Sequence, residues 1–139
     1  METKRQTGIW IDTSKAIIIS LDGKKEEKIT EIDSDVENSV YHNKEGNKGV
    51  FNGSNHGSSE TKFDERKKQQ LDYFLKSVLS YVHGSDELYV FGPAGTKTKL
   101  EQKILDGKLI DASKLKAVET SDKMTINQIV AKVKHFYNQ

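Results

Sequence analysis

Hydrophobic and polar residues alternate in three short runs near the start of the chain. Residues 8–12 (GIWID) and 16–21 (AIIISL) are rich in β-branched and aromatic side chains, and residues 13–15 between them suit a tight turn. An Asp-Gly pair then favours a second turn, and residues 26–34 alternate well enough to predict an edge-like third strand. We therefore expect three antiparallel strands in this part of the chain.

Beyond residue 62, segments with a helical period alternate with segments typical of strands. Apolar residues fall on one helical stripe over residues 63–82, and Gly84 is expected to end that helix. Residues 87–92 (ELYVFG) are typical of a strand inside a sheet, where we also expect Phe91 and the earlier Trp10 to be core residues. The other predicted elements are a helix, a strand and a helix at residues 96–105, 115–120 and 126–136.

The order of these elements predicts the fold class. Three strands followed by α-β-α-β-α indicate an α/β protein with three layers, in which helices cover both faces of a mixed five-stranded sheet. The first strands of this sheet are expected to be antiparallel and the later ones parallel. Thr125 and Gln128 have the spacing of a capping box at the start of the last helix. We expect one domain over residues 1–139.

Between the third strand and the first helix the pattern disappears. Residues 35–61 are rich in Gly, Asn and Ser and contain few large apolar side chains. Such a segment cannot bury enough surface to offset the entropy of ordering its backbone. We predict a flexible loop at about residues 35–61, and long loops of this kind are usually functional or disordered.

Composition narrows the class of protein. The net charge of +1 gives no overall attraction to nucleic acid or to an anionic membrane, so any such attraction must be local. The absence of cysteine excludes disulfides, cysteine-based zinc sites and thiol nucleophiles. No apolar run approaches a membrane span of roughly 20 residues, and no signal peptide is recognisable, which favours a cytosolic protein without a membrane partner.

A local cluster of basic residues lies in the loop and at the predicted start of the first helix. Arg66 and Lys67 are expected to lie off the apolar stripe and to face solvent. The cluster predicts contacts with RNA phosphates, whereas the interleaved acids Glu60, Asp64 and Glu65 favour an ordinary solvated face. The candidate RNA-binding residues are Lys44, Lys48, Lys62, Arg66, Lys67 and Lys68.

The run FGPAGTKTKL, residues 91–100, offers a weaker anion site. A strand leads through small residues into a helix start, where free N–H groups favour an anion and where Lys97 and Lys99 add positive charge. Gly92, Gly95, Thr96 and Lys97 would form the site. Alternatively, the turn only redirects the chain and Thr96 caps the helix.

Three carboxylates near strand ends raise the question of a metal site. If Asp12, Glu119 and Asp122 converged, they could hold a cation such as Mg²⁺ for a nuclease reaction. Asp12 is otherwise expected to form an Asx turn, with the other two acids at a helix start. The spacing reveals no fixed catalytic set and implies no cofactor, so we expect binding rather than catalysis.

Taken together, these segments resemble a known family. GIWIDTSKAIIISLDGKKEEKITEI, FDERKKQQLDYFLKSVLSYV and ELYVFGPAGTKTKLEQKI, in this order, resemble the middle domain of the archaeal and eukaryotic class-one release factor and of Pelota, over about residues 8–137. The chain looks still more similar to short bacterial proteins related to that domain, often labelled translational machinery proteins, which share GIWID, the FGP turn and VETSDKMTINQIVAKV.

The resemblance implies a ribonuclease H-like fold of the translational-machinery type and a role on the ribosome. In release factors the corresponding loop carries a Gly-Gly-Gln tripeptide that promotes hydrolysis of peptidyl-tRNA. This sequence lacks the tripeptide, because Gly46, Gly49, Gly53 and Gly57 are all unpaired and none precedes Gln. Pelota also lacks it, so the resemblance favours a ribosome-associated role without hydrolysis.

The sequence thus predicts a non-catalytic module that binds the ribosome or tRNA through the loop and the basic helix start. A metal-dependent hydrolase and a protein–protein adaptor that uses the loop remain the alternatives.

Overall fold

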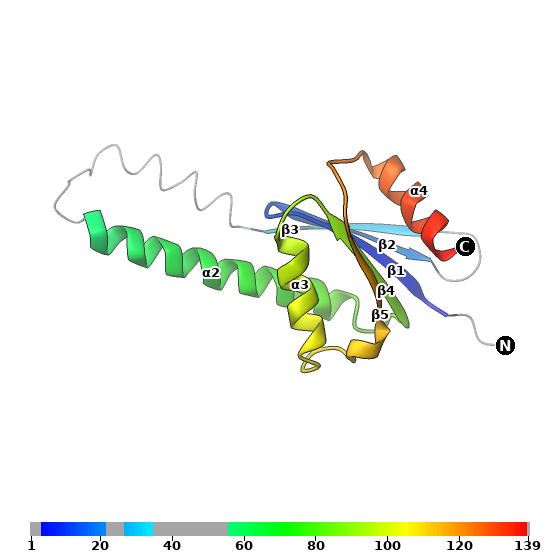
Figure 1. Ribbon diagram of the computed structural model, residues 1–139, viewed down its shortest axis with the longest axis horizontal. Coiled ribbons are helices and arrows are strands. Elements are labelled where there is room, and N and C mark those ends of the chain that lie inside the picture. The colour runs from blue at the N-terminus through cyan, green and yellow to red at the C-terminus, as the bar shows by residue number, and fades with distance from the viewer. Residues whose placement is uncertain (1–3, 22–26, 35–55, 139) are drawn as a thin grey trace.

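The protein has a three-layer α/β fold built around one mixed sheet (Figure 1). A computed structural model describes residues 4–21, 27–34 and 56–138, with side chains in the last range described from residue 65 onward. The predicted flexible loop at 35–61 therefore lies mostly outside the described residues, as do the candidate residues Lys44 and Lys48 within it.

Five strands form the sheet in the order β3-β2-β1-β4-β5. Their bounds are β1 Gln6–Ile11, β2 Lys15–Leu21, β3 Glu27–Asp33, β4 Glu87–Gly92 and β5 Leu115–Thr120. The first three strands pair antiparallel, whereas β4 pairs parallel with both β1 and β5. The predicted mixed sheet and the edge position of β3 are both confirmed.

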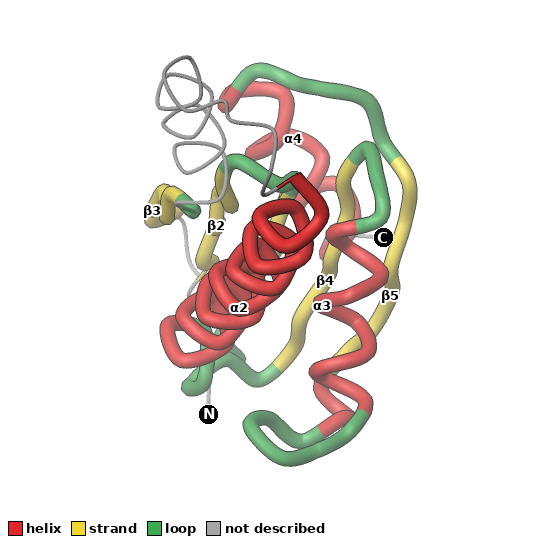
Figure 2. Tube along the Cα trace, turned by 90° about the vertical axis from the view of Figure 1, so that its left-hand side faces the viewer, coloured by secondary structure: helices red, strands yellow, loops and turns green. Residues whose placement is uncertain are grey.

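In the described parts of the chain, three α-helices cover the sheet, and a short 3₁₀ helix (η2) precedes β5. Their bounds are α2 His56–Tyr81, α3 Thr96–Leu105, η2 Ala112–Lys114 and α4 Ile126–Tyr137. Figures 1 and 2 show α2 and α3 on one face of the sheet and α4 on the other. The predicted capping box is present, since Thr125 accepts from the Gln128 backbone and the Gln128 side chain accepts from the Thr125 backbone.

Alternation along the inner strands places apolar side chains on both faces of the sheet. On β1 and β4, Ile9 and Val90 face α2 and α3, whereas Trp10 and Phe91 face α4. Trp10 and Phe91 are almost completely buried, as the sequence predicted. Burial on both sides fixes the positions of the helices.

The start of α2 differs from the prediction. The helix begins at His56 rather than near residue 63, so residues 56–61 are helical and do not belong to a loop. The polar run that forms these first turns has no apolar stripe, and periodicity cannot detect it. Helix propagation adds one hydrogen bond per residue and needs no apolar partner once the helix is nucleated.

The cap of α3 also differs. Gly95, not Thr96, is the N-cap residue, and no side chain caps this end. Thr96 is the first helical residue and is buried.

Gly92 marks a close approach between neighbouring strands. A Cβ atom at Gly92 would overlap the backbone carbonyl oxygen of Ile11, which cannot move without disturbing β1. At Gly95, by contrast, a Cβ atom would meet nothing within 4 Å.

We predict that Gly92→Ala lowers the free energy of unfolding by about 1–3 kcal/mol or more, because the added methyl group must displace backbone. Gly95→Ala is the matched control and should change it by less than about 1 kcal/mol. Urea unfolding followed by circular dichroism measures both values. Equal stability of the two variants would contradict the close approach.

Candidate nucleic-acid interface

Helix α2 extends beyond the body of the protein (Figure 1). It has 26 residues and is therefore about 39 Å long. Among the side chains of α2 that the structure describes, which begin at residue 65, Phe74 is the first buried one, and residues 65–73 are exposed or half-buried. Leu71 already packs against the core, and the part of α2 before it extends outward (Figure 1); we call residues 62–68 within that part the basic arm.

The residues of the basic arm differ in their surroundings. Arg66 and Lys68 are exposed, whereas Lys67 is half-buried and already takes part in an interaction. The expectation that Lys67 faces solvent was therefore wrong, because its position on the helix turns it toward the side that packs on the sheet. The Lys62 side chain lies outside the described residues. With a start at His56, the cluster also lies beyond the first turn of α2 rather than at its beginning.

Arg66 and Lys68 point to different sides of α2. Two helical steps of roughly 100° each separate their directions. Lys68 lies on the side of α3, where a hollow of about 390 Å³ opens between the two helices. We call this hollow the lysine pocket; its lining residues are Lys68, Leu71, Asp72, Leu75, Lys99, Gln102, Lys103 and Asp106.

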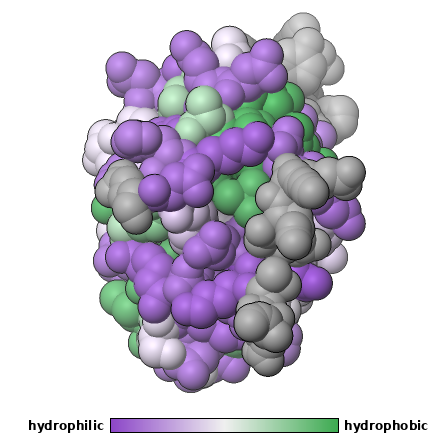
Figure 3. All heavy atoms as spheres, turned by 90° about the vertical axis from the view of Figure 1, so that its right-hand side faces the viewer, coloured by the Kyte–Doolittle hydropathy of each residue, from purple (hydrophilic) through white to green (hydrophobic). Residues whose placement is uncertain are grey.

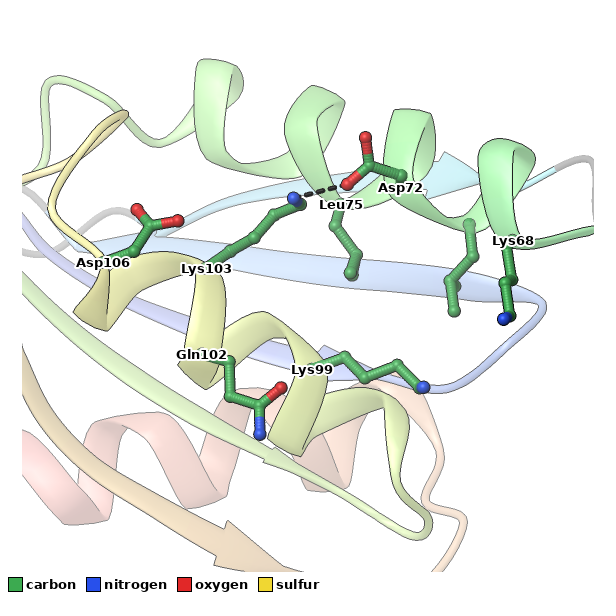
Figure 4. Close-up of a pocket in the computed structure, with 8 residues that line it drawn as sticks. Lys68, Asp72, Leu75, Lys99, Gln102, Lys103 and Asp106 are labelled. Carbon is green, nitrogen blue, oxygen red and sulfur yellow. Dashed lines mark ion pairs between the residues drawn. The ribbon is translucent and has the colours of Figure 1, made fainter. Parts of the chain in front are cut away.

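Two rows of side chains with the same spacing build the lysine pocket. Residues at positions i, i+3, i+4 and i+7 lie on one side of a helix, so each row faces the other helix. The α2 row is Lys68, Leu71, Asp72 and Leu75, and the α3 row is Lys99, Gln102, Lys103 and Asp106. Figure 4 shows Lys68 and Lys99 at the same end of the pocket, with Asp106 at the opposite end.

Asp72 neutralises part of this charge. Its Oδ1 atom pairs with Lys103 across the pocket, and its Oδ2 atom lies 3.2 Å from the Nζ atom of Lys76 on the same helix. The hydrogen bond from Lys103, supported by Lys76, holds the pKa of the Asp72 carboxyl below its usual value. The ordinary cost of moving this partly exposed carboxylate out of water acts in the opposite direction and is smaller.

No carboxylate of the described residues neutralises Lys68 or Lys99 in this way. Among the residues that the structure describes, neither forms an ion pair with a carboxylate. Asp106 lies at the opposite end of the pocket, where its Oδ1 atom accepts a hydrogen bond from the Lys108 backbone N–H group at 2.9 Å. Counting only the described side chains, the end of the pocket formed by Lys68 and Lys99 therefore carries an excess of positive charge, which suits an anion.

A second hollow of about 200 Å³ lies on the other side of α2, where the helix packs near the end of β3. Within the described structure, the Gln70 Oε1 atom is buried and accepts no hydrogen bond. Tyr73 beside it is 74% exposed. An unpartnered buried acceptor next to an exposed aromatic ring suits a ligand with N–H donors and a flat face. The lining residues are Asp33, Ser34, Gln69, Gln70, Tyr73, Phe74 and Ser77.

The residues predicted to form an anion site at the glycine turn instead have structural roles within the protein. Gly92 serves the close approach to Ile11, and Thr96 is buried. The Lys97 Nζ atom donates to the Ala94 carbonyl at 2.7 Å and so closes the turn. Each of these residues thus has a local structural role, and Lys99 turns toward the lysine pocket instead (Figure 4).

The fold does not gather Asp12, Glu119 and Asp122 into one group that could hold a metal ion. The described residues contain no group of three His, Cys, Asp or Glu side chains that could hold a metal ion. Asp12 forms the expected Asx turn, because its Oδ1 atom accepts from the backbone N–H groups of Ser14 at 2.8 Å and Lys15 at 3.0 Å. Glu119 accepts from the Tyr89 hydroxyl at 2.6 Å, and this hydrogen bond and the burial of Tyr89 raise the pKa of that phenol.

Figure 3 views the end of the molecule opposite the basic arm. Figure 3 shows mostly hydrophilic residues there, with hydrophobic areas between them, as is normal for protein surfaces. None of the described helices combines the length and apolar character needed to cross a lipid bilayer.

Sequence reasoning missed Asp72 and Lys103, and it considered Lys99 only as part of the glycine turn. The matching i, i+3, i+4 and i+7 spacings were a usable signal. They became informative only once α2 and α3 were known to lie side by side.

Comparisons with known proteins address the fold. No protein-family model and no curated protein sequence matches the chain. Among solved structures, it is similar to the archaeal translation termination factor aRF1, with 13% identity and a TM-score of 0.52, over 96% of this chain and 39% of that chain. It is also similar to the Pelota protein of Thermoplasma acidophilum, with 8% identity and a TM-score of 0.50, over 99% of this chain and 40% of that one.

The chain thus spans about two fifths of the length of each of these proteins. At such low identity the similarity establishes a shared fold. It confirms the fold expected from the resemblance to release factors and Pelota.

We predict that Asp72→Asn destabilises the protein at pH 7 by less than about 1 kcal/mol, since the ion pair is partly exposed. Because the pKa of the folded carboxyl is lowered, this stabilisation is present above the ordinary pKa of 3.8 and is lost as the pH falls through the folded value. The difference between the two proteins should therefore vanish in strong acid. Urea unfolding across the acidic range measures it.

The control is Glu31→Gln, which changes an exposed carboxylate that forms no ion pair among the described residues. This variant should unfold like the wild-type chain at pH 7. A difference between Asp72→Asn and the wild type that stays constant down to the lowest pH would contradict the predicted ion-pair contribution.

Proposed function

We propose that this chain is a non-catalytic module of the translation apparatus that binds ribosomal RNA or tRNA. The observation that carries the proposal is the continuity of the basic arm with the lysine pocket, on a helix that projects from the body. The fold that the chain shares with a translation termination factor and with Pelota supports the choice of RNA as the partner.

Local charge supports the proposal better than overall charge. With a net charge of +1, the protein has no general affinity for polyanions. Arg66, Lys68 and Lys99 are nevertheless exposed, and Lys68 and Lys99 line the same pocket while Arg66 lies on another side of α2. Each phosphate that such a residue contacts releases counterions, so binding would be strong at low salt and would weaken steeply as salt rises.

A projecting helix is a suitable device for reaching RNA. The rigid α/β body can hold the distal part of the helix at a fixed angle. That part of the helix can then enter a space too narrow for the whole protein. Lys44, Lys48 and Lys62 remain sequence-based candidates for further phosphate contacts.

Binding without catalysis is proposed for two reasons. The sequence lacks the Gly-Gly-Gln tripeptide of release factors. In addition, two of the three strand-end acids have structural roles: the Asp12 carboxylate stabilises a turn, and the Glu119 carboxylate accepts a hydrogen bond from the Tyr89 hydroxyl.

A protein–protein adaptor is the second candidate function. The exposed Tyr73 favours it, because aromatic side chains next to a hollow often anchor protein partners, and the adjacent Gln70 Oε1 atom is buried and has no hydrogen-bond partner among the described residues. Ribonuclease treatment separates the two functions: it should release an RNA-binding module from large particles but leave an adaptor attached to its protein partner.

We expect the double variant Arg66→Glu/Lys68→Glu to lose at least about tenfold in co-sedimentation with ribosomes, because two phosphate contacts become repulsive. Lys67 is left unchanged because it is half-buried. Sucrose-gradient fractionation of lysate at physiological salt, with and without ribonuclease, provides the measurement.

The matched control is Lys28→Glu/Lys123→Glu, which makes the same change in charge at exposed positions outside α2 and the lysine pocket. It should sediment like the wild-type chain. Unchanged sedimentation of the Arg66→Glu/Lys68→Glu variant, or an equal loss in both, would refute the assignment of the basic arm.

A further inference from the structure

The lysine pocket has the composition of an anion site that is only partly filled by its own protein. Three lysines and two aspartates line it. Asp106 lies at one end and is engaged by the Lys108 backbone, whereas Lys68 and Lys99 reach into the other end (Figure 4). Lys103 lies between them, paired with Asp72.

We infer that the lysine pocket binds one phosphate group of an RNA backbone. Lys68 and Lys99 hold it at their end of the pocket, and Lys103 joins them by exchanging Asp72 for the phosphate. The inference rests on the proposed RNA-binding function and names the group that this part of the surface recognises. Asp72 then acts as a resident anion that an incoming ligand must displace.

The second partner of Asp72 makes this exchange feasible. After Lys103 leaves, the Asp72 carboxylate still has Lys76, whose Nζ atom lies 3.2 Å from Oδ2 and which does not line the pocket. The Asp72 carboxylate therefore keeps one cationic partner, so ligand binding has to break only the Asp72–Lys103 ion pair and not the Asp72–Lys76 pair. Lys103 is also well placed for the change, since its side chain is only 22% exposed and it reaches into the pocket.

The shape of the pocket fits a phosphate within a chain better than a free ion. A volume of about 390 Å³ is much larger than one phosphate group and leaves room for the sugars on either side. The apolar side chains of Leu71 and Leu75 line the α2 side. Apolar walls lower the local dielectric and strengthen each ammonium–phosphate contact.

Asp72 also gives the site selectivity. A neutral ligand gains nothing from Lys103 and cannot replace the carboxylate. An anion competes with Asp72 directly, so binding is weaker than three free lysines would give. Removing the Asp72 charge should therefore strengthen binding, which is the opposite of what loss of an ordinary structural residue does.

The test uses fluorescence anisotropy with a labelled single-stranded RNA of about ten nucleotides, a length within the usual site sizes for such strands. Lys99→Gln should weaken binding by about three- to tenfold and lower the slope of log affinity against log salt by about 0.7. Asp72→Asn should strengthen binding by a similar factor. In the Lys103→Gln background Asp72→Asn should give no gain, because the exchange no longer exists.

Lys108→Gln is the matched control, because it removes an exposed lysine just beyond α3 that does not line the pocket. Far-UV circular dichroism verifies that each variant is folded. Equal effects of Lys99→Gln and Lys108→Gln would overturn the inference, and so would weaker binding by Asp72→Asn.

Inorganic pyrophosphate distinguishes a backbone phosphate from a free one. Competition only at concentrations on the order of millimolar supports the RNA assignment, whereas competition at micromolar concentrations would overturn it in favour of a small polyphosphate. The inference can also fail alone: if Lys99→Gln has no effect while Arg66→Glu/Lys68→Glu still abolishes co-sedimentation, the pocket is not the subsite but the proposed function stands. If neither variant has an effect, both proposals fall.

Discussion

Burial of both faces of the inner strands is the constraint on which the rest of this structure depends. β1, β2 and β4 each carry a run of large apolar residues, Ile9–Ile11, Ile17–Ile19 and Leu88–Phe91, and alternation divides these residues between two core clusters. Helix α4 packs on one cluster, whereas a single helix would not be enough to bury the other cluster. Both α2 and α3 therefore pack on the same face, and their outer sides meet along a groove.

The lysine pocket is a product of that arrangement. Each helix has one stripe for the core, and the row beside it is free to be polar. On α2 and α3 these rows face each other, so side chains that are far apart in the sequence share one local field. The pair Asp72–Lys103 joins the two rows, and Lys68 and Lys99 remain available at the end. In a protein with a net charge of +1, two lysines are thereby brought together at one end of this pocket.

The sequence predicted most of the architecture because its signals were local. Period and turn chemistry identified every strand, α3 and the capping box of α4, since each depends on residues within a few positions of one another. Two boundaries were missed at α2 and α3: polar turns extend α2 to His56, and Gly95 caps α3 without a side chain. Neither feature leaves a hydrophobic pattern to detect.

The site was predictable only in part, because it depends on tertiary contacts. Lys68 belonged to the expected basic cluster, but its separation from Arg66 around the helix changes which partners each can reach. Asp72 and Lys103 looked like ordinary surface charges until the two helices were brought together. The three strand-end acids show the converse, since chemically suitable residues were present but the fold does not gather them into one group, and Asp12 and Glu119 have separate structural roles.

The parallel pairing of β1 with β4 has a consequence for the sequence of events during synthesis. β1 and β2 can form a hairpin as soon as both have left the ribosome, but the other edge of β1 must wait for β4, whose Glu87 pairs with Gln6. Its second face waits longer still, for α4, where Val133 packs directly against Gly8. Until α4 emerges, no helix covers Ile17, Ile19 and Trp10. A nascent chain halted at that point would expose a hydrophobic surface to chaperones and to other chains.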